Sequence, residues 1–195
     1  MHPFEYVAAT NVTEVVSLLA RHGEGARVMA GGTDLLVQLR ADRYTLDALI
    51  DIKGVPEAID VHINGGGLSL GAAAPCYRLD EDQAVASGFP GIIDGSSIIG
   101  GTQIQSRASL GGNLCNATPS ADGICPLIVH SATATLTGTE GTREVPVEEF
   151  CTGPGQNVIG YGEFLLRLNV PKPAPRFGAA YQRFTPRNEM DIAVA

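Results

Sequence analysis

The sequence lacks the features by which most metalloproteins are recognised. It has four cysteines and four histidines, but no C-x-x-C pair and no histidine spacing typical of metal ligands. These absences argue against a zinc site or an iron–sulfur cluster on this chain. We therefore expect no metal site, and we interpret Cys76, Cys115, Cys125 and Cys151 as reduced thiols.

Positive charge and long apolar runs are also scarce. The chain carries 13 Lys and Arg against 21 Asp and Glu, for a formal net charge of −8. That balance argues against a nucleic-acid surface and against binding to anionic membranes. No apolar run is long enough to span a bilayer, and the opening MHPFEYVAAT does not resemble a signal peptide. We expect a cytoplasmic protein with no nucleic-acid partner and no membrane insertion.

Two common phosphate-binding patterns are missing as well. The chain has neither the G-x-G-x-x-G dinucleotide fingerprint nor the G-x-x-x-x-G-K-[ST] phosphate loop, so an ordinary Rossmann or ATPase fold is disfavoured. What it does have is the composition of a folded protein, with 44% hydrophobic residues, 17% charged residues and 24 glycines. A length of 195 residues fits one larger domain or two small lobes.

The first part of the chain, residues 1–55, alternates helical and strand patterns. An amphipathic stretch with Gly23 at its end is followed by a short apolar strand, a glycine turn, a second helix and a second buried strand. This order predicts a small α/β lobe with a parallel core. The expected helices are residues 13–21 and 35–40, and the expected strands are residues 27–30 and 49–52.

The second part, residues 56–195, mixes hairpin and helix patterns. Alternating apolar residues around glycines predict antiparallel hairpins, which makes this a larger α+β lobe with an antiparallel sheet. The expected hairpins pair residues 59–63 with 68–70, 133–137 with 142–145, and 163–170 with 177–183. The expected helices are residues 80–86, 91–99 and 124–130.

A first glycine segment, residues 30–35, joins a predicted strand to a predicted helix. Gly31 and Gly32 precede Thr33 and Asp34, either of which is a good helix cap. Free backbone N–H groups at such a junction favour a phosphate. The pair of glycines alone is a weak signal, because similar pairs occur in many loops that bind nothing.

A second glycine segment, residues 109–122, reads SLGGNLCNATPSAD and is the most informative stretch of the chain. We expect Gly111 and Gly112 to form a turn, with positive φ available, which another molecule approaches closely. Backbone N–H groups there suit phosphate oxygens, whereas a carboxylate repels phosphate and prefers hydroxyl donors. The segment therefore predicts a ligand with phosphates and sugar hydroxyls. Its polar side chains are Asn113, Asn116, Thr118, Ser120 and Asp122.

Both segments resemble a known family at this separation. The stretches AGGTDLLVQLR and SLGGNLCNATPSAD are similar to motifs of the FAD-binding (medium) subunits of molybdenum hydroxylases, the xanthine dehydrogenase and carbon monoxide dehydrogenase type. The opening HPFEYVAATNVTEVVSLLARHG, the stretch EEFCTGPGQNVI and the closing RFTPRNEMDIAVA also resemble the family, so the resemblance covers essentially the whole chain.

The resemblance implies a two-lobed fold of the PCMH or vanillyl-alcohol oxidase type, with FAD in the cleft between the lobes. It implies that the first segment wraps the pyrophosphate through Ala30, Gly31, Gly32, Thr33, Asp34 and Leu35. The second segment would hold the cofactor through Ser109, Gly111, Gly112, Asn113, Thr118, Ser120 and Asp122, the last by accepting bonds from a sugar hydroxyl. Leu165 would pack near the flavin ring, and Arg183 would lie beside the cofactor.

The function implied is electron transfer. In the family, a molybdenum subunit oxidises the substrate, a two-iron two-sulfur subunit relays electrons, and FAD passes them to a terminal acceptor. The resemblance therefore implies FAD on this chain, with the molybdenum cofactor and the iron–sulfur clusters on partner subunits. It also implies that the usual C-terminal domain of the family is absent after Ala195.

Two alternatives remain at this point. The chain could be a flavin-free scaffold or assembly subunit of the same complex, because a fold alone does not establish a function. It could also be a stand-alone flavin oxidoreductase. No side chain forms a convincing general base, so we expect no catalytic residue and assign the reactive chemistry to the cofactor.

Overall fold

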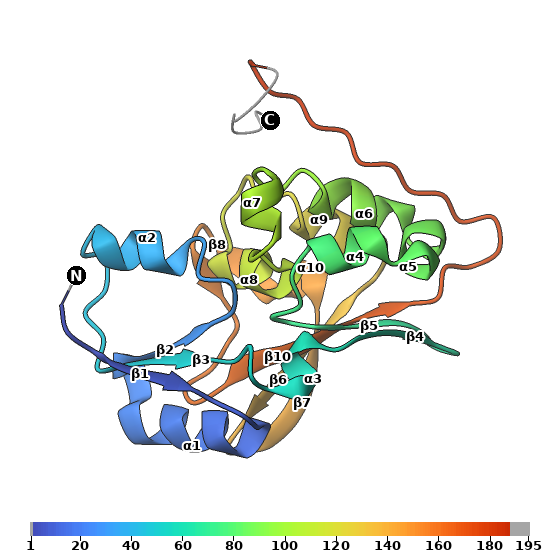
Figure 1. Ribbon diagram of the computed structural model, residues 1–195. Coiled ribbons are helices and arrows are strands. Elements are labelled where there is room, and N and C mark those ends of the chain that lie inside the picture. The colour runs from blue at the N-terminus through green and yellow to red at the C-terminus, as the bar shows by residue number, and fades with distance from the viewer. Residues whose placement is uncertain (1, 188–195) are drawn as a thin grey trace.

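The computed structural model describes residues 2–187, and Figure 1 shows their arrangement. The chain forms an α+β structure with a three-stranded sheet, a five-stranded sheet and a two-stranded ribbon. The first sheet comes from residues before 52, and the second from residues after 60. This confirms the predicted fold class, a small parallel unit followed by a larger unit with an antiparallel sheet.

The three-stranded sheet is parallel throughout and has the order β1-β3-β2. Its central strand is buried along its whole length, and α1 packs on it through Val15, Leu18 and Leu19. Asn11 begins α1 by accepting a hydrogen bond from the Glu14 N–H. The elements are β1 (Glu5–Ala8), α1 (Val12–His22), η1 (Gly23–Gly25), β2 (Ala26–Met29), α2 (Leu35–Arg40) and β3 (Ala48–Asp51).

The five-stranded sheet is antiparallel and has the order β4-β5-β10-β6-β7. Its longest strand, β10, lies in the middle and pairs with β5 on one side and β6 on the other. The strands are β4 (Val61–Asn64), β5 (Gly67–Gly71), β6 (Thr133–Gly138), β7 (Gly141–Pro146) and β10 (Phe164–Pro171).

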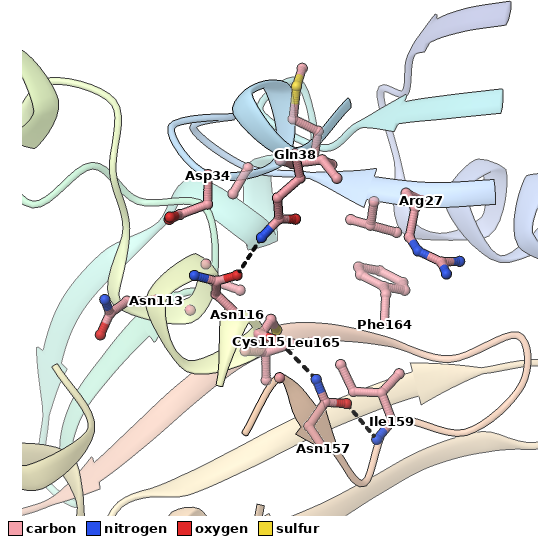
Figure 2. Close-up of a pocket in the computed structure, with 18 of the residues that line it drawn as sticks. Arg27, Asp34, Gln38, Asn113, Cys115, Asn116, Asn157, Ile159, Phe164 and Leu165 are labelled. Carbon is pink, nitrogen blue, oxygen red and sulfur yellow. Dashed lines mark hydrogen bonds between the residues drawn. The ribbon is translucent and has the colours of Figure 1, made fainter. Parts of the chain in front are cut away.

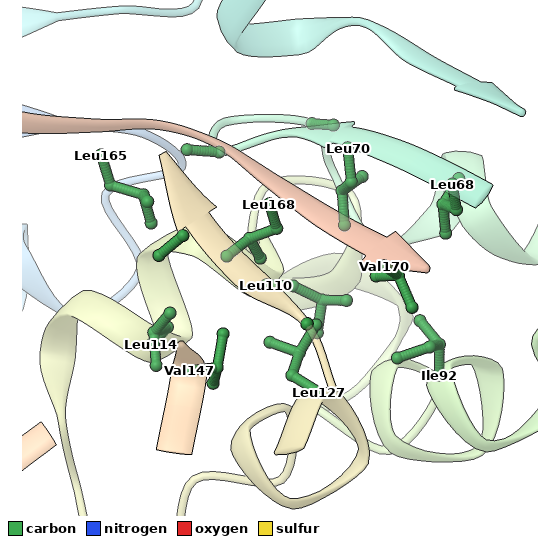
Figure 3. Close-up of a cluster of buried hydrophobic side chains, with 14 of the residues drawn as sticks. Leu68, Leu70, Ile92, Leu110, Leu114, Leu127, Val147, Leu165, Leu168 and Val170 are labelled. Carbon is green, nitrogen blue, oxygen red and sulfur yellow. The ribbon is translucent and has the colours of Figure 1, made fainter. Parts of the chain in front are cut away.

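Short helices cover one face of this sheet (Figure 1). Leucines from β5, β10 and the helices form the main core, including Leu70, Leu110, Leu114 and Leu168 (Figure 3). The helices are α4 (Tyr77–Glu81), α5 (Gln83–Gly88), α6 (Pro90–Ser96), α7 (Thr102–Gln105), α8 (Leu110–Asn116) and α9 (Ile124–Val129). The remaining elements are α3 (Pro56–Ile59), α10 (Val147–Phe150), β8 (Cys151–Gly153) and β9 (Gln156–Asn157).

The two units share part of their core. Phe164 and Leu166 of β10 pack in the cluster formed by α1 and β3, together with Ala58 and Ala73. This packing joins the parallel sheet to the antiparallel one and fixes how the two units lie against each other. The division into lobes at residues 55 and 56 remains a prediction, and residues 188–195 of the expected second lobe lie outside the described residues.

The predicted strand at residues 177–183 is wrong. That segment has no regular secondary structure and runs across the helical side of the molecule (Figure 1). Its expected partner, β10, already uses both edges to pair with β5 and β6, so no edge is free for a third strand. The predicted helix at residues 80–86 is two helices, because Asp82 leaves the helical conformation and caps α5 by accepting from the Ala84 and Val85 N–H groups.

Candidate functional site

A cavity of about 1290 Å³ lies between the two units and is lined by both glycine segments. Most of the predicted site residues meet there, although they come from distant parts of the chain (Figure 2). The cavity is lined by Ala30, Gly31, Gly32, Thr33, Asp34, Leu35, Ser109, Gly111, Gly112, Asn113, Thr118, Ser120 and Leu165.

The first glycine segment follows β2 at the carboxyl end of the parallel sheet. Gly32 has a φ of +77°, a conformation that residues with a Cβ adopt rarely. Gly31 lies so close to the backbone carbonyl of Arg107 that a Cβ would collide with it. The first glycine therefore permits contact with the second unit, and the second glycine permits the turn itself.

The expected helix cap in this segment is wrong. Asp34 occupies the cap position of α2, but its backbone is already helical and its side chain makes no capping hydrogen bond. The Asp34 side chain instead stands in the cleft (Figure 2), where burial raises the pKa of its carboxyl.

The expected glycine turn in the second segment is also wrong. Gly111 and Gly112 lie inside α8, and neither has a positive φ. Ser109 caps this helix, because its Oγ accepts a hydrogen bond of 3.0 Å from the Gly112 N–H. The cap draws the chain into a helix directly after Ser109, so the two glycines continue that helix.

The two glycines of α8 face different surroundings. A Cβ on Gly111 would collide with the backbone of Ala72, whereas a Cβ on Gly112 would meet only Ser109 Oγ at 3.1 Å and Ala30 Cβ at 3.8 Å. Gly111 therefore brings α8 close to the antiparallel sheet. Gly112 leaves room beside the first glycine segment, where a ligand can approach the backbone.

Two amide side chains of α8 bind this helix to the loop that follows it and to α2. Asn113 Oδ1 accepts a hydrogen bond of 3.0 Å from the Gly123 N–H. Asn116 Oδ1 accepts one of 2.9 Å from Gln38 Nε2, which crosses the cleft from α2 (Figure 2). Gln38 and Asn116 both line the cavity, so this bond fixes the separation of the two glycine segments.

Asp122 and Arg183 are not among the residues that line the cavity. They are brought to each other, with Arg183 Nε 3.6 Å from Asp122 Oδ1. The same oxygen accepts a hydrogen bond of 2.7 Å from the Tyr181 hydroxyl. Burial and this bond to a carboxylate raise the pKa of Tyr181. The contact of Asp122 and Arg183 with the cofactor remains a prediction.

Several lining residues were not predicted. Asn157 of β9 links two segments that line the cavity. Its side chain donates to the Cys115 carbonyl at 2.9 Å and accepts from the Ile159 N–H at 3.1 Å. At one end, the Arg27 guanidinium lies 5.2 Å from the centre of the Tyr44 ring. Asn157 lies in the stretch EEFCTGPGQNVI, which resembles the family but was assigned no site role, and no motif marks Arg27 or Tyr44. Among residues 2–187, no cluster of three or more His, Cys, Asp or Glu side chains could hold a metal ion.

Residues 2–173 match the family described as the FAD binding domain in molybdopterin dehydrogenase. The chain belongs to that family. FAD, the predicted cofactor, is the ligand that defines it, and the predicted resemblance is confirmed.

Named relatives and solved structures agree with this membership. The chain is 32% identical over 190 residues to the xanthine dehydrogenase FAD-binding subunit of Escherichia coli O157:H7, covering 96% of the chain and 65% of the relative. It is 28% identical over 180 residues to the carbon monoxide dehydrogenase medium chain of Afipia carboxidovorans, covering 92% of the chain and 62% of the relative. The chain therefore spans slightly less than two thirds of these relatives.

The fold closely matches part of one chain of a solved carbon monoxide dehydrogenase. Reconstituted carbon monoxide dehydrogenase from Oligotropha carboxidovorans superposes with a TM-score of 0.93 at 28% identity, over 98% of this chain and 67% of that one. Quinoline 2-oxidoreductase from Pseudomonas putida 86 superposes with a TM-score of 0.90 at 27% identity, over 98% of this chain and 66% of that one. No helix within residues 2–187 is long and apolar enough to cross a membrane.

Proposed function

We propose that this chain is an FAD-binding electron-transfer subunit of a molybdenum-containing hydroxylase. The observation that carries the proposal is the meeting of the two glycine segments across one cavity of about 1290 Å³, in a chain of the FAD-binding family. The predicted site residues form the binding site in this proposal, and none of them acts as an acid or a base.

The residues present fit a dinucleotide. Gly32, with its positive φ, shapes the loop on one wall so that its backbone faces a ligand, and Gly112, which has no side chain, lets a ligand come close to α8 on the opposite wall. Thr118 and Ser120 offer hydroxyls, and apolar side chains such as Leu165 line the rest of the cavity. Both α2 and α8 are short, of six and seven residues, so the loop N–H groups and side chains are the main binding groups.

Bound FAD would supply the redox chemistry, by accepting electrons and passing them on. This chain would bind and orient the cofactor and shield it from water. The iron–sulfur clusters and the molybdenum cofactor would belong to a small and a large partner subunit, in keeping with relatives named as medium chains and complex subunits. We propose the cytoplasm as the location, in keeping with four free thiols.

The test is to add FAD to the purified full chain and remove the excess. We expect a yellow protein whose flavin absorption band is bleached by dithionite. Colourless protein that does not bind added FAD would instead support the alternative of a flavin-free scaffold subunit. Turnover of a small substrate by the isolated chain would support a stand-alone oxidoreductase.

A second measurement tests the electron-transfer role. The full chain is mixed with candidate iron–sulfur and molybdenum chains from the same organism, and flavin reduction is followed after substrate is added. We expect reduction only when all the chains are present. Reduction that proceeds without the iron–sulfur chain would contradict the proposed route.

A further inference from the structure

Three parallel strands end beside the first glycine segment, and one polar cluster links them. The Tyr6 hydroxyl of β1 donates to Asp51 Oδ2 at the end of β3, at 2.7 Å. Lys53 Nζ donates to the same oxygen at 2.6 Å and to the Ala30 carbonyl beyond β2 at 2.9 Å. The carboxyl ends of parallel strands are where open α/β sheets place their ligands.

The Lys53 ammonium is held in a fixed position. Its side chain is 30% exposed and that of Asp51 only 9%. Asp51 also accepts a bond of 3.0 Å from the Lys53 backbone N–H, so lysine and carboxylate are joined at both ends. Burial alone would raise the pKa of Asp51, but the bonds from Lys53 and Tyr6 outweigh it and hold that pKa below its usual value. The carboxyl therefore stays charged and keeps the ammonium in place.

The bond from Lys53 to Ala30 determines how the next peptide faces. In a trans peptide the C=O and the following N–H point in opposite directions, and no cis peptide occurs within residues 2–187. Because the Ala30 carbonyl points toward Lys53, the Gly31 N–H points away from it. Gly31 lines the cavity, and its peptide is free of side-chain constraints of its own.

Lys53 acts on the cavity through the orientation of this peptide, because Asp51 neutralises its charge at 2.6 Å. The cationic side chains among the residues that line the cavity are Arg27 and Arg43, whereas Asp34 belongs to the glycine segment itself. Lys53 is not a lining residue. Because Asp51 stays charged and pairs with the ammonium, the pair has little net charge, and the oriented Gly31 N–H is what it offers to an anion.

We propose that Lys53 is a positioning residue for the phosphate end of the cofactor: held by Asp51 and Tyr6, it fixes the Ala30 carbonyl and thereby directs the Gly31 N–H toward a bound pyrophosphate. This inference rests on the proposed binding of FAD. It assigns a role to Lys53, which lies outside both glycine segments.

The test replaces Lys53 with methionine, which keeps the length of the side chain and removes its donors. FAD is titrated into the full apo-chain, and the dissociation constant is read from the quenching of flavin fluorescence. Loss of a charged hydrogen bond predicts that Lys53→Met weakens binding by about tenfold to hundredfold. Lys53→Arg should restore most of the affinity. The matched control is Lys172→Met, which removes the charge of the chain's second and last lysine, at an exposed position.

A spectroscopic readout separates positioning from general instability. We expect the ³¹P resonances of saturating bound FAD to shift in Lys53→Met and to return in Lys53→Arg. If Lys53→Met does not fold because Asp51 loses its partner, the double variant Asp51→Asn, Lys53→Met removes that charge and is measured instead. Affinity and ³¹P shifts equal to wild type, or equal losses in Lys53→Met and Lys172→Met, would overturn the inference. A wild-type chain that binds no FAD would overturn the proposed function instead.

Discussion

The two glycine segments share a composition but expose their backbone in different ways. In the first, Gly32 takes a left-handed conformation in a loop at the end of a parallel strand. In the second, Gly112 lies in a regular helix and exposes the backbone only because it lacks a side chain. One wall of the cleft thus depends on glycine for its conformation, and the other depends on glycine for space.

The first comparison is between Gly31 and a glycine with no neighbours. Gly31→Ala would drive a Cβ into the Arg107 carbonyl, at the contact between the two units. We expect a loss of stability of about 1–3 kcal/mol, because backbone on both sides must move, together with loss of FAD binding. The measurements are the melting temperature of the apo-chain and its flavin content.

The control for this variant is Gly65→Ala, in the turn between β4 and β5. A Cβ there meets nothing within 4 Å, and the residue has no positive φ. Its stability and flavin content should match the wild type. Equal melting temperatures for Gly31→Ala and Gly65→Ala would show that the backbone at Arg107 moves aside at little cost. Gly31 would then not be required for the contact between the two units.

The second prediction separates binding from folding within α8. Gly112→Val would fill the space beside Ala30 and block approach to the backbone, so we expect FAD binding to be abolished. The apo-chain should stay folded, because the nearest neighbour is the Ser109 hydroxyl rather than backbone. Gly111→Val should instead lower the melting temperature of the apo-chain, since its Cβ meets the Ala72 backbone. Normal flavin content in Gly112→Val would remove this segment from the site.

The sequence was sufficient to identify the two segments and the fold class, because both follow from local patterns. Small polar residues beside glycines mark the segments, and the periods of apolar residues distinguish the parallel unit from the antiparallel one. It was not sufficient to predict the conformation at Gly111 and Gly112. Whether two glycines turn or continue a helix depends on the Ser109 cap and on the nearby Ala72 backbone.

Contacts between distant residues were the other limit. Nothing near Lys53 in the sequence indicates that its ammonium reaches the Ala30 carbonyl, because the two meet only when β2 and β3 pair. The hydrogen bond between Gln38 and Asn116 across the cleft could not be predicted from the sequence for the same reason. The strand expected at residues 177–183 failed because alternation alone does not show that both edges of β10 are already paired.

The third prediction contrasts the two helix starts. Ser109→Ala removes the bond to the Gly112 N–H and should cost about 1 kcal/mol of stability. Asp34→Ala should cost the helix nothing through capping, because Asp34 makes no cap bond. Chemical denaturation of both apo-variants measures the difference. Equal losses of unfolding free energy in the two variants would show that the Ser109 cap stabilises α8 no more than Asp34 stabilises α2.

The fourth prediction concerns Asp122, which ends the second segment. If a sugar hydroxyl binds this carboxylate, Asp122→Ala should weaken FAD binding by about threefold to tenfold, the loss of one hydrogen bond. Tyr181→Phe removes a neighbour of the same carboxylate and should leave FAD affinity unchanged, while proteases cut residues 172–187 faster. Equal FAD losses in both variants would instead show that Asp122 acts by holding the C-terminal segment.

The smallest expected effect is a pH dependence within the first unit, where two carboxyl groups respond in opposite directions. The pKa of Asp51 is lowered in the folded chain, so its stabilisation is present above the unfolded pKa and is lost as pH falls through the folded one. Burial raises the pKa of Asp34, so the protein loses stability at this group as pH rises through the folded pKa.

Unfolding free energies of the wild type, Asp51→Asn and Asp34→Asn, measured between about pH 3 and pH 6, should reveal both pH dependences. The wild-type advantage over Asp51→Asn should shrink on acidification, and its disadvantage against Asp34→Asn should shrink as well. Parallel curves for all three proteins would mean that neither carboxyl is coupled to folding, and the Asp51–Lys53 pair would then be too weakly held to position a loop.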